Sequence, residues 1–585
     1  APPDYNFVAD VAGASPAVAV SNAEALRQAI DACKGQGPTK LVIPKGTYRF
    51  APAHTIAIEN LTDLTLDGQG SVLILEDIPR EGPSIYVGNC TRTLLENFTL
   101  DWDWTVKPIA SLGTVSNLSP DKLQCDFTFP DLNATQTDLT RTTPWRGLDP
   151  MDPTHLICIG AGGVRLPKGT IIAAGSAGNI LHVTLPTPVP LVDGQTYCIR
   201  HMYYDGGGFK VANSSDLTFN AVDIYSIPSM GFFFNGTMHN FQLTNCKILR
   251  APGSRNPFTT AADGIHVDEF VDNLNIENCS ITGCGDDAMN IHNECYEGEV
   301  VPDPTDSAML TLLNCPSYQL RLSPGDPVEF DNADYSYLNN STTPVTDQVA
   351  TVSSVNKGIP QTVIHFAAPL PPGITAQSIL RNAKFSSSNV RITGCDIIYS
   401  NGRGILLSAE NALVSHCHIQ DVRATAINLE SQIVQPLWTE GRGAANVLIK
   451  NNVFENDNRL GRYYGAIIYT NADIPWGPTT ATLYKQISIE DNQFINCPGP
   501  AMSLTDCSDV LVRSNVIKLT DPLAEANRYA GAIFITNSSD LALGGNTWVS
   551  SVATSSDYGV VYDPATISNL STDTNAVTNT SSASK

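Results

Sequence analysis

One short pattern recurs along the chain and restricts what it can fold into. Its core is an apolar residue, any residue, a second apolar residue, two further residues and then Cys or Asn. The closest copies are 22 and 23 residues apart, and other intervals hold extra loop. Copies end at Cys246, Cys279, Cys395, Cys417, Asn452, Asn492, Asn515 and Asn546. A period near 22, with β-branched residues at alternate positions, is typical of one coil of a right-handed parallel β-helix with three short strands per turn.

The Cys or Asn that closes each copy falls in one column of such a stack. Asn side chains in successive coils can form a hydrogen-bonded amide ladder, and Cys is a small buried residue that fills the same position. We therefore interpret Cys246, Cys279, Cys395 and Cys417 as structural residues and not as nucleophiles.

A second strand follows each copy, and its alignment gathers charged residues. When the small residue that begins this strand is aligned, Asp263, Asp287, Arg403 and Thr425 share one column. Asp286 stands one place before Asp287, at the mouth of the strand. Neighbouring strands of a sheet lie about 4.8 Å apart, so carboxylates on successive coils are close neighbours.

Three crowded aspartates predict acid/base chemistry. Carboxylates this close repel one another, so at least one should have a raised pKa and stay protonated in mildly acidic solution. A protonated carboxyl can donate to a glycosidic oxygen while an ionised one activates water, which in an inverting glycosidase requires a separation of about 6.5–9.5 Å. The alternative is that Asp263, Asp286 and Asp287 cap turns or bind calcium.

The remaining segments complete an all-β prediction. A short amphipathic helix over 22–30, with an N-cap at Ser21 or Asn22, precedes a strand interrupted by Pro44 and Gly46. Two stretches break the repeat and are predicted to be inserted β-barrels or β-sandwiches. The predicted segments are 1–104 (cap and first coils), 105–200 (first insertion), 201–297 (coils with the aspartates), 298–386 (second insertion), 387–565 (C-terminal coils) and 566–585 (flexible tail).

The composition and charge of the chain limit the kinds of binding partner that we expect. The net charge of −24 and the pI near 4.7 argue against nucleic acid and anionic membranes. No run of 18 apolar residues is present, and no CxxC pair offers a metal site, so we expect neither a membrane span nor a metal or other cofactor. The start at Ala1 without Met and frequent glycosylation sequons predict a secreted, N-glycosylated chain. Sequons occur at Asn60, Asn97, Asn117, Asn133, Asn213, Asn235, Asn340, Asn537 and Asn569.

Several motifs from about residue 90 to 460 resemble a known enzyme family. They are Arg200-His201-Met202-Tyr203-Tyr204, Ser229-Met230-Gly231, Ser254-Arg255, Ala262-Asp263-Gly264-Ile265-His266, Gly285-Asp286-Asp287-Ala288-Met289-Asn290-Ile291-His292, Arg403-Gly404-Ile405-Leu406-Leu407 and Trp438-Thr439-Glu440. In order and spacing they resemble the exo-acting α-galactosidases of glycoside hydrolase family 110, which are β-helices with small barrel insertions. The aspartate pattern more distantly resembles polygalacturonases of family 28, but their Gly-His-Gly and Arg-Ile-Lys motifs are absent.

The resemblance implies roles within the aspartate group. Asp286 would be the general acid, and Asp263 and Asp287 would share the activation of water. Further candidates for contacts with sugar are polar or aromatic residues near these motifs: His266, His292, Arg403, Asp101, Asp103, Glu440, Trp104, Tyr203, Tyr204 and Trp438. For each, the alternative is a packed, ion-paired or solvated residue without a role in binding.

The predicted function is a secreted, inverting, metal-independent exo-glycosidase acting on terminal α-galactosides. One rival is a polygalacturonase-like hydrolase of pectic α-galacturonides. A second is a polysaccharide lyase, which requires Ca²⁺ or a Lys/Arg base. A third is a non-catalytic carbohydrate-binding or adhesive β-helix, although binding alone does not require three crowded carboxylates.

Overall fold

The computed structural model covers the whole chain. It describes residues 16–77, 82–105, 107–130, 145–159, 163–166, 173–177, 179–206, 208–296, 299–315, 321–341, 343–356, 360–434, 438–459, 465–475, 477–520, 529–550, 559–572 and 576–578. Residues 1–15 and the sequon at Asn133 lie outside these residues.

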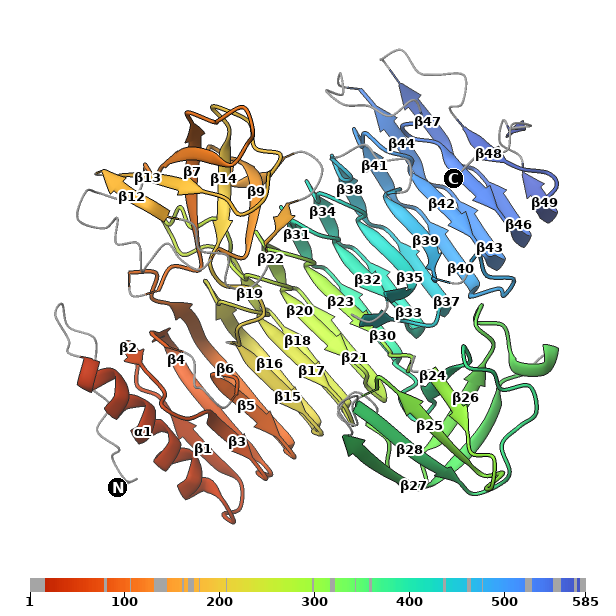
Figure 1. The fold of residues 1–585 in the computed structure, drawn as a ribbon, viewed down its shortest axis with the longest axis horizontal. Helices are drawn as coiled ribbons and strands as arrows, with labels where there is room; N and C mark the ends of the chain where they lie inside the picture. Colours follow the sequence, from red (N-terminus) through yellow and green to blue (C-terminus); the bar gives the residue numbers. More distant parts are fainter. Residues whose placement is uncertain are drawn as a thin grey trace.

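A right-handed parallel β-helix forms the body of the molecule, as the repeat predicts (Figure 1). Each coil contributes strands to three stacked columns. Two columns join in one large parallel sheet, and a third column forms the second sheet. The helix α1 (Pro16–Cys33) covers the first coils, and no helix among the described residues combines the length and apolarity of a membrane span.

The first sheet contains the following strands: β1 (Thr39–Val42), β2 (Thr47–Phe50), β4 (Leu64–Leu75), β6 (Thr91–Trp102), β16 (Ser215–Ile224), β18 (His239–Thr244), β19 (Lys247–Ile248), β21 (Asp272–Glu277), β22 (Ser280–Thr282), β30 (Ser388–Thr393), β31 (Asp396–Ile398), β33 (Glu410–Ser415), β34 (His418–Gln420), β37 (Ala444–Lys450), β38 (Val453–Glu455), β40 (Tyr484–Glu490), β41 (Gln493–Ile495), β43 (Cys507–Arg513), β44 (Val516–Leu519), β46 (Ser538–Gly544), β47 (Thr547–Ser550) and β49 (Ile567–Thr572).

The second sheet supports the candidate site. Its strands are β3 (Ile56–Glu59), β5 (Ile85–Gly88), β15 (Phe209–Ala212), β17 (Phe232–Asn235), β20 (Ile265–Asp268), β23 (Met289–His292), β32 (Ile405–Leu407), β35 (Ile427–Val434), β36 (Trp438–Glu440), β39 (Ile468–Asp473), β42 (Met502–Thr505), β45 (Ile533–Thr536), β48 (Val560–Tyr562) and β50 (Ala576–Thr578). All pair in parallel except β36, which pairs antiparallel with β35.

The interior of the coils is apolar, and one polar ladder runs through it. Inward-facing residues alternate with outward-facing ones, and a continuous apolar core follows the axis. Asn452, Asn492, Asn515 and Asn546 each bond to the next through Nδ2–H···Oδ1 contacts of 2.9–3.0 Å. The predicted amide ladder is therefore present. All fourteen cysteines are buried, and those of the column fill the ladder position, which agrees with a structural role.

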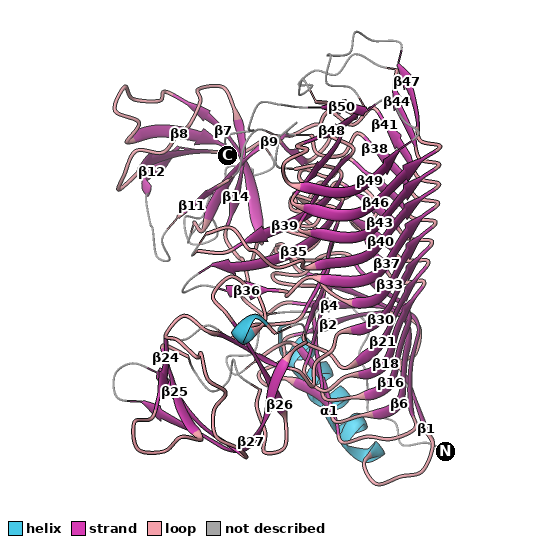
Figure 2. Cartoon of the chain, turned by 90° about the vertical axis from the view of Figure 1, so that its right-hand side faces the viewer, coloured by secondary structure: helices cyan, strands magenta, loops and turns pink. Residues whose placement is uncertain are grey.

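Two antiparallel sheets interrupt the helix and lie on the same side of it (Figure 2). The first contains β7 (Ala110–Ser116), β8 (Gln124–Thr128), β9 (Gly147–Asp152), β10 (Ile157–Cys158), β11 (Val164–Arg165), β12 (Ala173–Ala177), β13 (Ile180–Thr184) and β14 (Thr196–Arg200). The second contains β24 (Glu299–Pro302), β25 (Met309–Leu313), β26 (Pro327–Asp331), β27 (Val345–Asn356), β28 (Pro360–Phe366) and β29 (Ile379–Asn382), with the 3-10 helix η1 (Leu338–Asn340). Each has its own apolar core.

Two predictions at the ends of the chain differ from the structure. The helix α1 already includes residues 16–21, so Ser21 and Asn22 are not N-caps; Asn22 is buried and its side chain donates to the Arg49 carbonyl at 3.1 Å. Residues 567–572, predicted to be part of a flexible tail, form β49, which continues the hydrogen-bond ladder of β46. A further coil can add there because an edge strand offers unpaired backbone groups.

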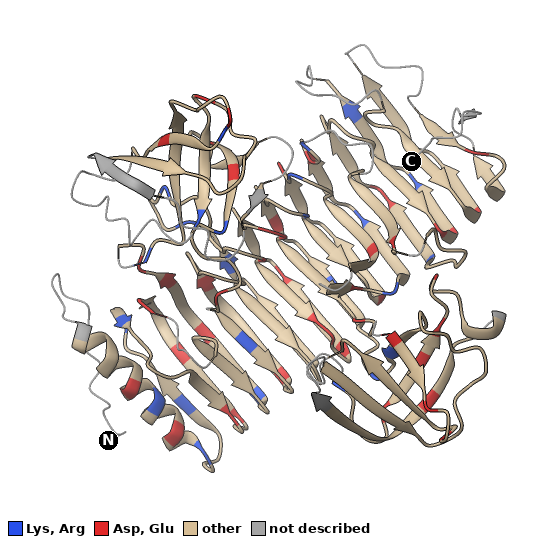
Figure 3. Cartoon of the chain, viewed as in Figure 1, with Lys and Arg blue, Asp and Glu red and all other residues tan. Residues whose placement is uncertain are grey.

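Charged residues are distributed over the helix and both insertions. Figure 3 shows basic segments interspersed with acidic ones in the described part of the chain.

Candidate active site

The register of the second sheet places the aspartate column as predicted. Because Ile265 pairs with Met289, and Met289 with Ile405, the residues two places earlier share one column: Asp263, Asp287 and Arg403. Backbone bonds continue the ladder through this column, from Gly264 N to Asp287 O at 2.9 Å and from Ala288 N to Arg403 O at 3.0 Å. One oxygen each of Asp263, Asp286 and Asp287 lie within 4.8 Å of one another.

Asp263 is buried next to a histidine. Its Oδ2 lies 2.6 Å from His266 Nδ1, and its Oδ1 accepts the Asp287 N–H at 3.2 Å. Burial, followed by the negative charges of Asp286 and Glu440, raises the pKa of Asp263 well above its usual range. The folded protein therefore favours the protonated form of this carboxyl group.

Asp287 is buried too, but it contacts a cation. Its Oδ1 accepts the Arg403 backbone N–H at 2.5 Å, and its Oδ2 lies 2.8–2.9 Å from the Arg403 guanidinium. Burial raises the pKa of Asp287, and Arg403 opposes that effect. The same guanidinium bonds Glu430 and, at 3.0 Å, Glu440. Although burial opposes its ionisation, Glu440 has its pKa lowered to about 2 by Arg403 above all.

Asp286 has a different environment. It is partly exposed, and its Oδ2 accepts hydrogen bonds from the hydroxyls of Tyr203 at 2.5 Å and Tyr204 at 3.1 Å. Both bonds fall on the same oxygen, so Oδ1 is available to a ligand. The two rings meet edge to face, with centroids 4.3 Å apart, which fixes their hydroxyls beside the carboxylate.

Two cavities meet at Asp286. The acidic cavity, of about 320 Å³, is lined by Tyr204, Met230, Asp263, His266, Asp286, Asp287, Asn290, His292, Glu294, Arg403, Gln432, Trp438, Thr439 and Glu440. The insertion cavity, of about 380 Å³, is lined by Arg146, Gly147, Asp149, Gly163, Leu166, Arg200, Tyr203, Tyr204, Gly285, Asp286, Asn401 and Arg423. Only Tyr204 and Asp286 belong to both linings. These two side chains therefore stand on the boundary between the cavities.

Neutral imidazoles line part of the acidic cavity. His266 and His292 contact each other, with their Nε2 atoms 3.3 Å apart. Burial lowers the pKa of both groups, which favours their neutral forms in mildly acidic solution. Asn290 neighbours His266 on the next coil and is buried; its Nδ2 donates to Glu440 at 3.0 Å, but its Oδ1 has no partner among the described residues.

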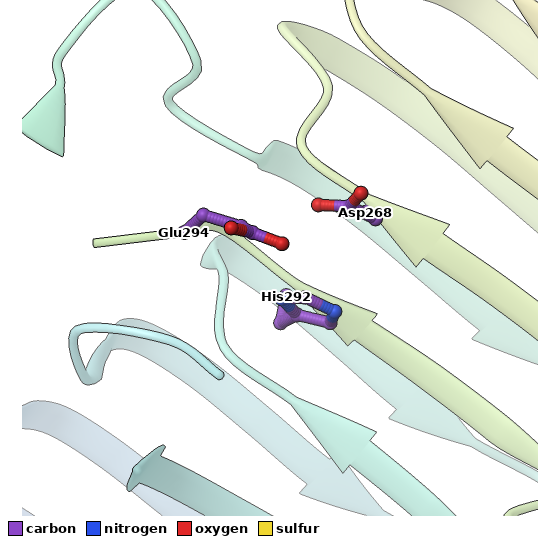
Figure 4. Close-up of side chains that lie close together, drawn as sticks. All are labelled: Asp268, His292 and Glu294. Carbon is purple, nitrogen blue, oxygen red and sulfur yellow. The ribbon is translucent and has the colours of Figure 1, made fainter. Parts of the chain in front are cut away.

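Asp268, His292 and Glu294 lie close together (Figure 4), and His292 and Glu294 also line the acidic cavity. They include acceptor atoms within 4.8 Å of one another, a spacing that suits a metal ion. Asp268, however, already pairs with the guanidinium of Arg321, at 2.5 and 3.1 Å. Burial and the neighbouring Asp268 charge raise the pKa of Glu294 well above its usual range, which favours a carboxyl group that carries its own proton. Arg321 thus offsets part of the negative charge at this group of residues.

Most of the predicted sugar-binding residues line these cavities. His266, His292, Arg403, Trp438 and Glu440 line the acidic cavity, Tyr203 lines the insertion cavity, and Tyr204 lines both. Trp438 is partly exposed, and its indole Nε1–H donates to Gln432 at 3.0 Å.

Asp101, Asp103 and Trp104 line neither of these two cavities, and their contacts with sugar remain a prediction. Asp103 is buried in an ion pair with Arg49. Asp101 accepts the Ser226 hydroxyl at 2.6 Å, and the Trp104 indole donates to the same Ser226 Oγ at 2.9 Å. Asp101 lies near the end of β6, and Asp103 and Trp104 follow that strand just before the first insertion.

Several residues that shape the site were not predicted from the sequence. Glu430 bonds Arg403 from β35, and Asn428, two places earlier, donates to Glu430 at 2.7 Å. The sequence pattern that could have indicated them is a polar residue at alternate positions of an otherwise apolar strand. Arg200 was known only as part of a motif. It is buried, and its Nη1 and Nη2 donate to the carbonyls of Ala261 at 2.8 Å and Gly285 at 2.6 Å, which fixes the backbone just before two of the aspartates.

The fold and the carboxylate site define the class: the chain is a glycoside hydrolase built on a right-handed parallel β-helix. The family model described as "Right handed beta helix region" matches residues 198–318 and 438–580. Alpha-1,3-galactosidase B of Bacteroides thetaiotaomicron is 24% identical over 533 residues, which cover 84% of this chain and 82% of that protein. Alpha-1,3-galactosidase A of Shewanella woodyi is 22% identical over 561 residues, covering 90% and 88% of the two chains. The resemblance to family 110 that the motifs indicate is thereby confirmed.

Two solved structures follow a similar chain path but have low sequence identity and low TM-scores. The catalytic unit of a GH87 alpha-1,3-glucanase from Streptomyces thermodiastaticus is 11% identical, with a TM-score of 0.41, over 94% of this chain and 66% of that one. The A-module of the Azotobacter vinelandii mannuronan C-5 epimerase AlgE4 is 10% identical, with a TM-score of 0.37, over 92% and 95% of the two chains.

Proposed function

We propose that this protein is an exo-acting α-galactosidase that removes terminal α-1,3-linked galactose. The observation that carries the proposal is the position of Asp286, on the boundary between the acidic cavity and the insertion cavity. A general acid of a glycosidase must reach the oxygen that joins the released sugar to the rest of the substrate. The proteins named alpha-1,3-galactosidase, similar over most of this chain, support the linkage.

The acidic cavity would hold the terminal galactose. In a single displacement, the Asp286 carboxyl donates its proton to the glycosidic oxygen as the bond from the anomeric carbon to that oxygen breaks. Water attacks the anomeric carbon from the opposite face and gives a proton to the Asp263–Asp287 pair. Arg403 favours the ionised form of Asp287, which makes Asp287 the better acceptor of that proton.

We propose inversion of configuration for this reaction. The closest carboxylate oxygens lie within 4.8 Å of one another, nearer than the separation of about 6.5–9.5 Å between the carboxyl groups of many inverting enzymes. The stereochemical outcome is therefore measured directly: proton NMR of the first-formed sugar should show β-galactose from an α-galactoside. Appearance of α-galactose first would contradict the water-activation mechanism.

The charge of the acidic cavity favours a neutral sugar over a uronide. Five carboxyl residues line it, against the single guanidinium of Arg403, which already bonds Asp287, Glu430 and Glu440. A galacturonate carboxylate bound there would meet like charges and no free cation among the lining residues. Neutral imidazoles and the Asn290 carbonyl suit sugar hydroxyls.

The direct test compares a galactose α-1,3-linked disaccharide with polygalacturonate as substrates of the same preparation. Release of galactose from the disaccharide alone supports the proposal, and release of uronic acid from polygalacturonate contradicts it. An unsaturated product that absorbs in the ultraviolet would instead identify a lyase, and binding without product would identify an adhesive β-helix.

We further propose that the protein is secreted and carries N-linked glycans. Five sequon asparagines are exposed: Asn60, Asn117, Asn213, Asn537 and Asn569. An enzyme that removes N-glycans should lower the apparent mass of the protein collected from the culture medium of its source. Retention in the cells at the mass of the bare polypeptide would contradict this proposal.

A further inference from the structure

The insertion cavity is built by two parts of the chain that are distant in sequence. Arg146, Asp149 and Leu166 come from the first insertion, whereas Gly285, Asn401 and Arg423 come from turns of the coils. Its volume of about 380 Å³ lies within the range of about 300–1,000 Å³ for small-molecule pockets. It meets the acidic cavity only at Tyr204 and Asp286.

From this arrangement we infer that the insertion cavity is the subsite for the leaving group, and that it binds a neutral sugar. The inference rests on the proposed function, because a proton donor at Asp286 separates the released sugar from the sugar that remains. If the acidic cavity holds the galactose, the next sugar of the substrate lies on the other side of Asp286.

The polar groups of the insertion cavity suit hydroxyls. The Nη2 of Arg146 pairs with Asp205 at 2.7 Å, but its buried Nε–H has no hydrogen-bond partner among the described residues. A buried donor without a partner is unfavourable, and a hydroxyl oxygen of a bound sugar would satisfy it. Leu166 and the tyrosine rings add apolar surface of the kind that contacts sugar faces.

The ion pairs of the cavity argue for a neutral sugar over an anionic one. Arg200 Nε donates to Asp149 at 2.6 Å, Arg423 lies 3.8 Å from the same carboxylate, and Arg146 pairs with Asp205. Each guanidinium therefore already has a carboxylate nearby. An added anion would meet Asp149 and Asp286 without an uncompensated positive charge to offset them.

The experiment compares two substrates that share the galactose but differ in the leaving group. One is galactose α-1,3-linked to a second neutral hexose, and the other is α-galactosyl fluoride, whose leaving group is too small to fill the insertion cavity. Two variants alter the cavity: Arg146→Met removes the donor, and Leu166→Trp fills space. Each variant should lower kcat/KM for the disaccharide about tenfold or more and change that for the fluoride less than about threefold.

Several outcomes overturn the inference. Equal losses on both substrates in both variants would show that the cavity supports the site structurally, and no loss on the disaccharide would place the second sugar elsewhere. Faster cleavage when the second sugar carries a carboxylate would contradict the neutral specificity. A wild-type enzyme that cleaves neither substrate would instead overturn the proposed function and, with it, the subsite. The melting temperatures of both variants should match that of the wild type. If loss of the Arg146–Asp205 pair prevents folding of Arg146→Met, the comparison of the two substrates is made with Leu166→Trp only.

Discussion

Two columns of the same β-helix use the same stacking geometry for opposite purposes. In the C-terminal coils, Asn452, Asn492, Asn515 and Asn546 stack as neutral amides, and each bonds to its neighbour. In the central coils, Asp263, Asp287 and Arg403 stack with Asp286 beside them. Burial and the neighbouring negative charges raise the pKa values of Asp263 and Asp287. Repetition on a rigid ladder therefore stabilises the chain where identical groups bond, and creates reactive groups where like charges are held together.

The largest effect on stability should come from the cation of the charged column. Arg403→Gln leaves Asp287, Glu430 and Glu440 buried without their shared guanidinium. Removing one partner of a buried ion pair costs about 3–5 kcal/mol, so we expect a loss of that order in the free energy of unfolding at neutral pH. Chemical denaturation measures it.

An exposed ion pair provides the matched control for Arg403. Arg513 pairs with Glu490 at 2.8 Å, and its side chain is 56% exposed. Arg513→Gln should change the free energy of unfolding by less than about 1 kcal/mol. Similar losses of stability in both variants would show that the buried position of Arg403 adds nothing to the effect of its ion pairs.

A substitution in the asparagine column should reduce stability less than Arg403→Gln does, and it should leave activity unchanged. Asn492→Ala removes the side chain that accepts from Asn452 and donates to Asn515 and to the Ile449 carbonyl. Because these partners are buried, we expect a loss of about 2–3 kcal/mol with kcat unchanged. A fall in kcat for Asn492→Ala at temperatures where the variant is folded would couple the two columns.

For Asp263→Asn we expect a smaller change in the free energy of unfolding, and this change should be a gain relative to wild type as the pH rises. Its pKa is raised in the folded state, so the folded chain binds more protons than the unfolded chain, and wild-type stability decreases as the pH rises above the ordinary carboxyl pKa near 3.8. Asp263→Asn lacks this titration. Its stability relative to wild type should therefore increase by up to about 1.4 kcal/mol for each pH unit in that window, and the difference should be constant below it.

Melting temperatures from pH 3 to pH 8 test the prediction for Asp263. Asp63 is the control, because Arg92 lowers its pKa and Asp63→Asn should show no such gain with pH. A decrease in the relative stability of Asp263→Asn as the pH rises would show that Asp263 is stabilised as an anion.

No effect is expected from removal of metal ions. Each of the two groups that could hold a cation contains a carboxylate already paired with arginine: Asp287 with Arg403 and Asp268 with Arg321. Galactose release should therefore be the same before and after dialysis against EDTA. Loss of activity that Ca²⁺ restores would contradict the account and favour the lyase hypothesis.

The repeat made much of this site predictable. A period of 22 or 23 residues determines which residues stack, so the column of Asp263, Asp287 and Arg403 follows from the sequence. Contacts between the coils and the insertions have no such period. The bonds of Arg200 to Gly285, 85 residues away, and the burial of Asp103 against Arg49 depend on how the first insertion packs on the coils. For that reason the ion pair of Asp103 and the contacts of Asp101 and Trp104 with Ser226 could not be predicted from the sequence.

The central claim, that Asp286 protonates the leaving group, has one direct measurement. It is the activity of Asp286→Asn on the α-1,3-linked disaccharide and on α-galactosyl fluoride, whose departure needs no proton. We predict that kcat on the disaccharide falls about 10²- to 10⁴-fold while the fluoride is cleaved at a rate much closer to that of the wild type. Equal losses on both substrates, or near-normal cleavage of the disaccharide, would contradict the assignment of Asp286 as the acid.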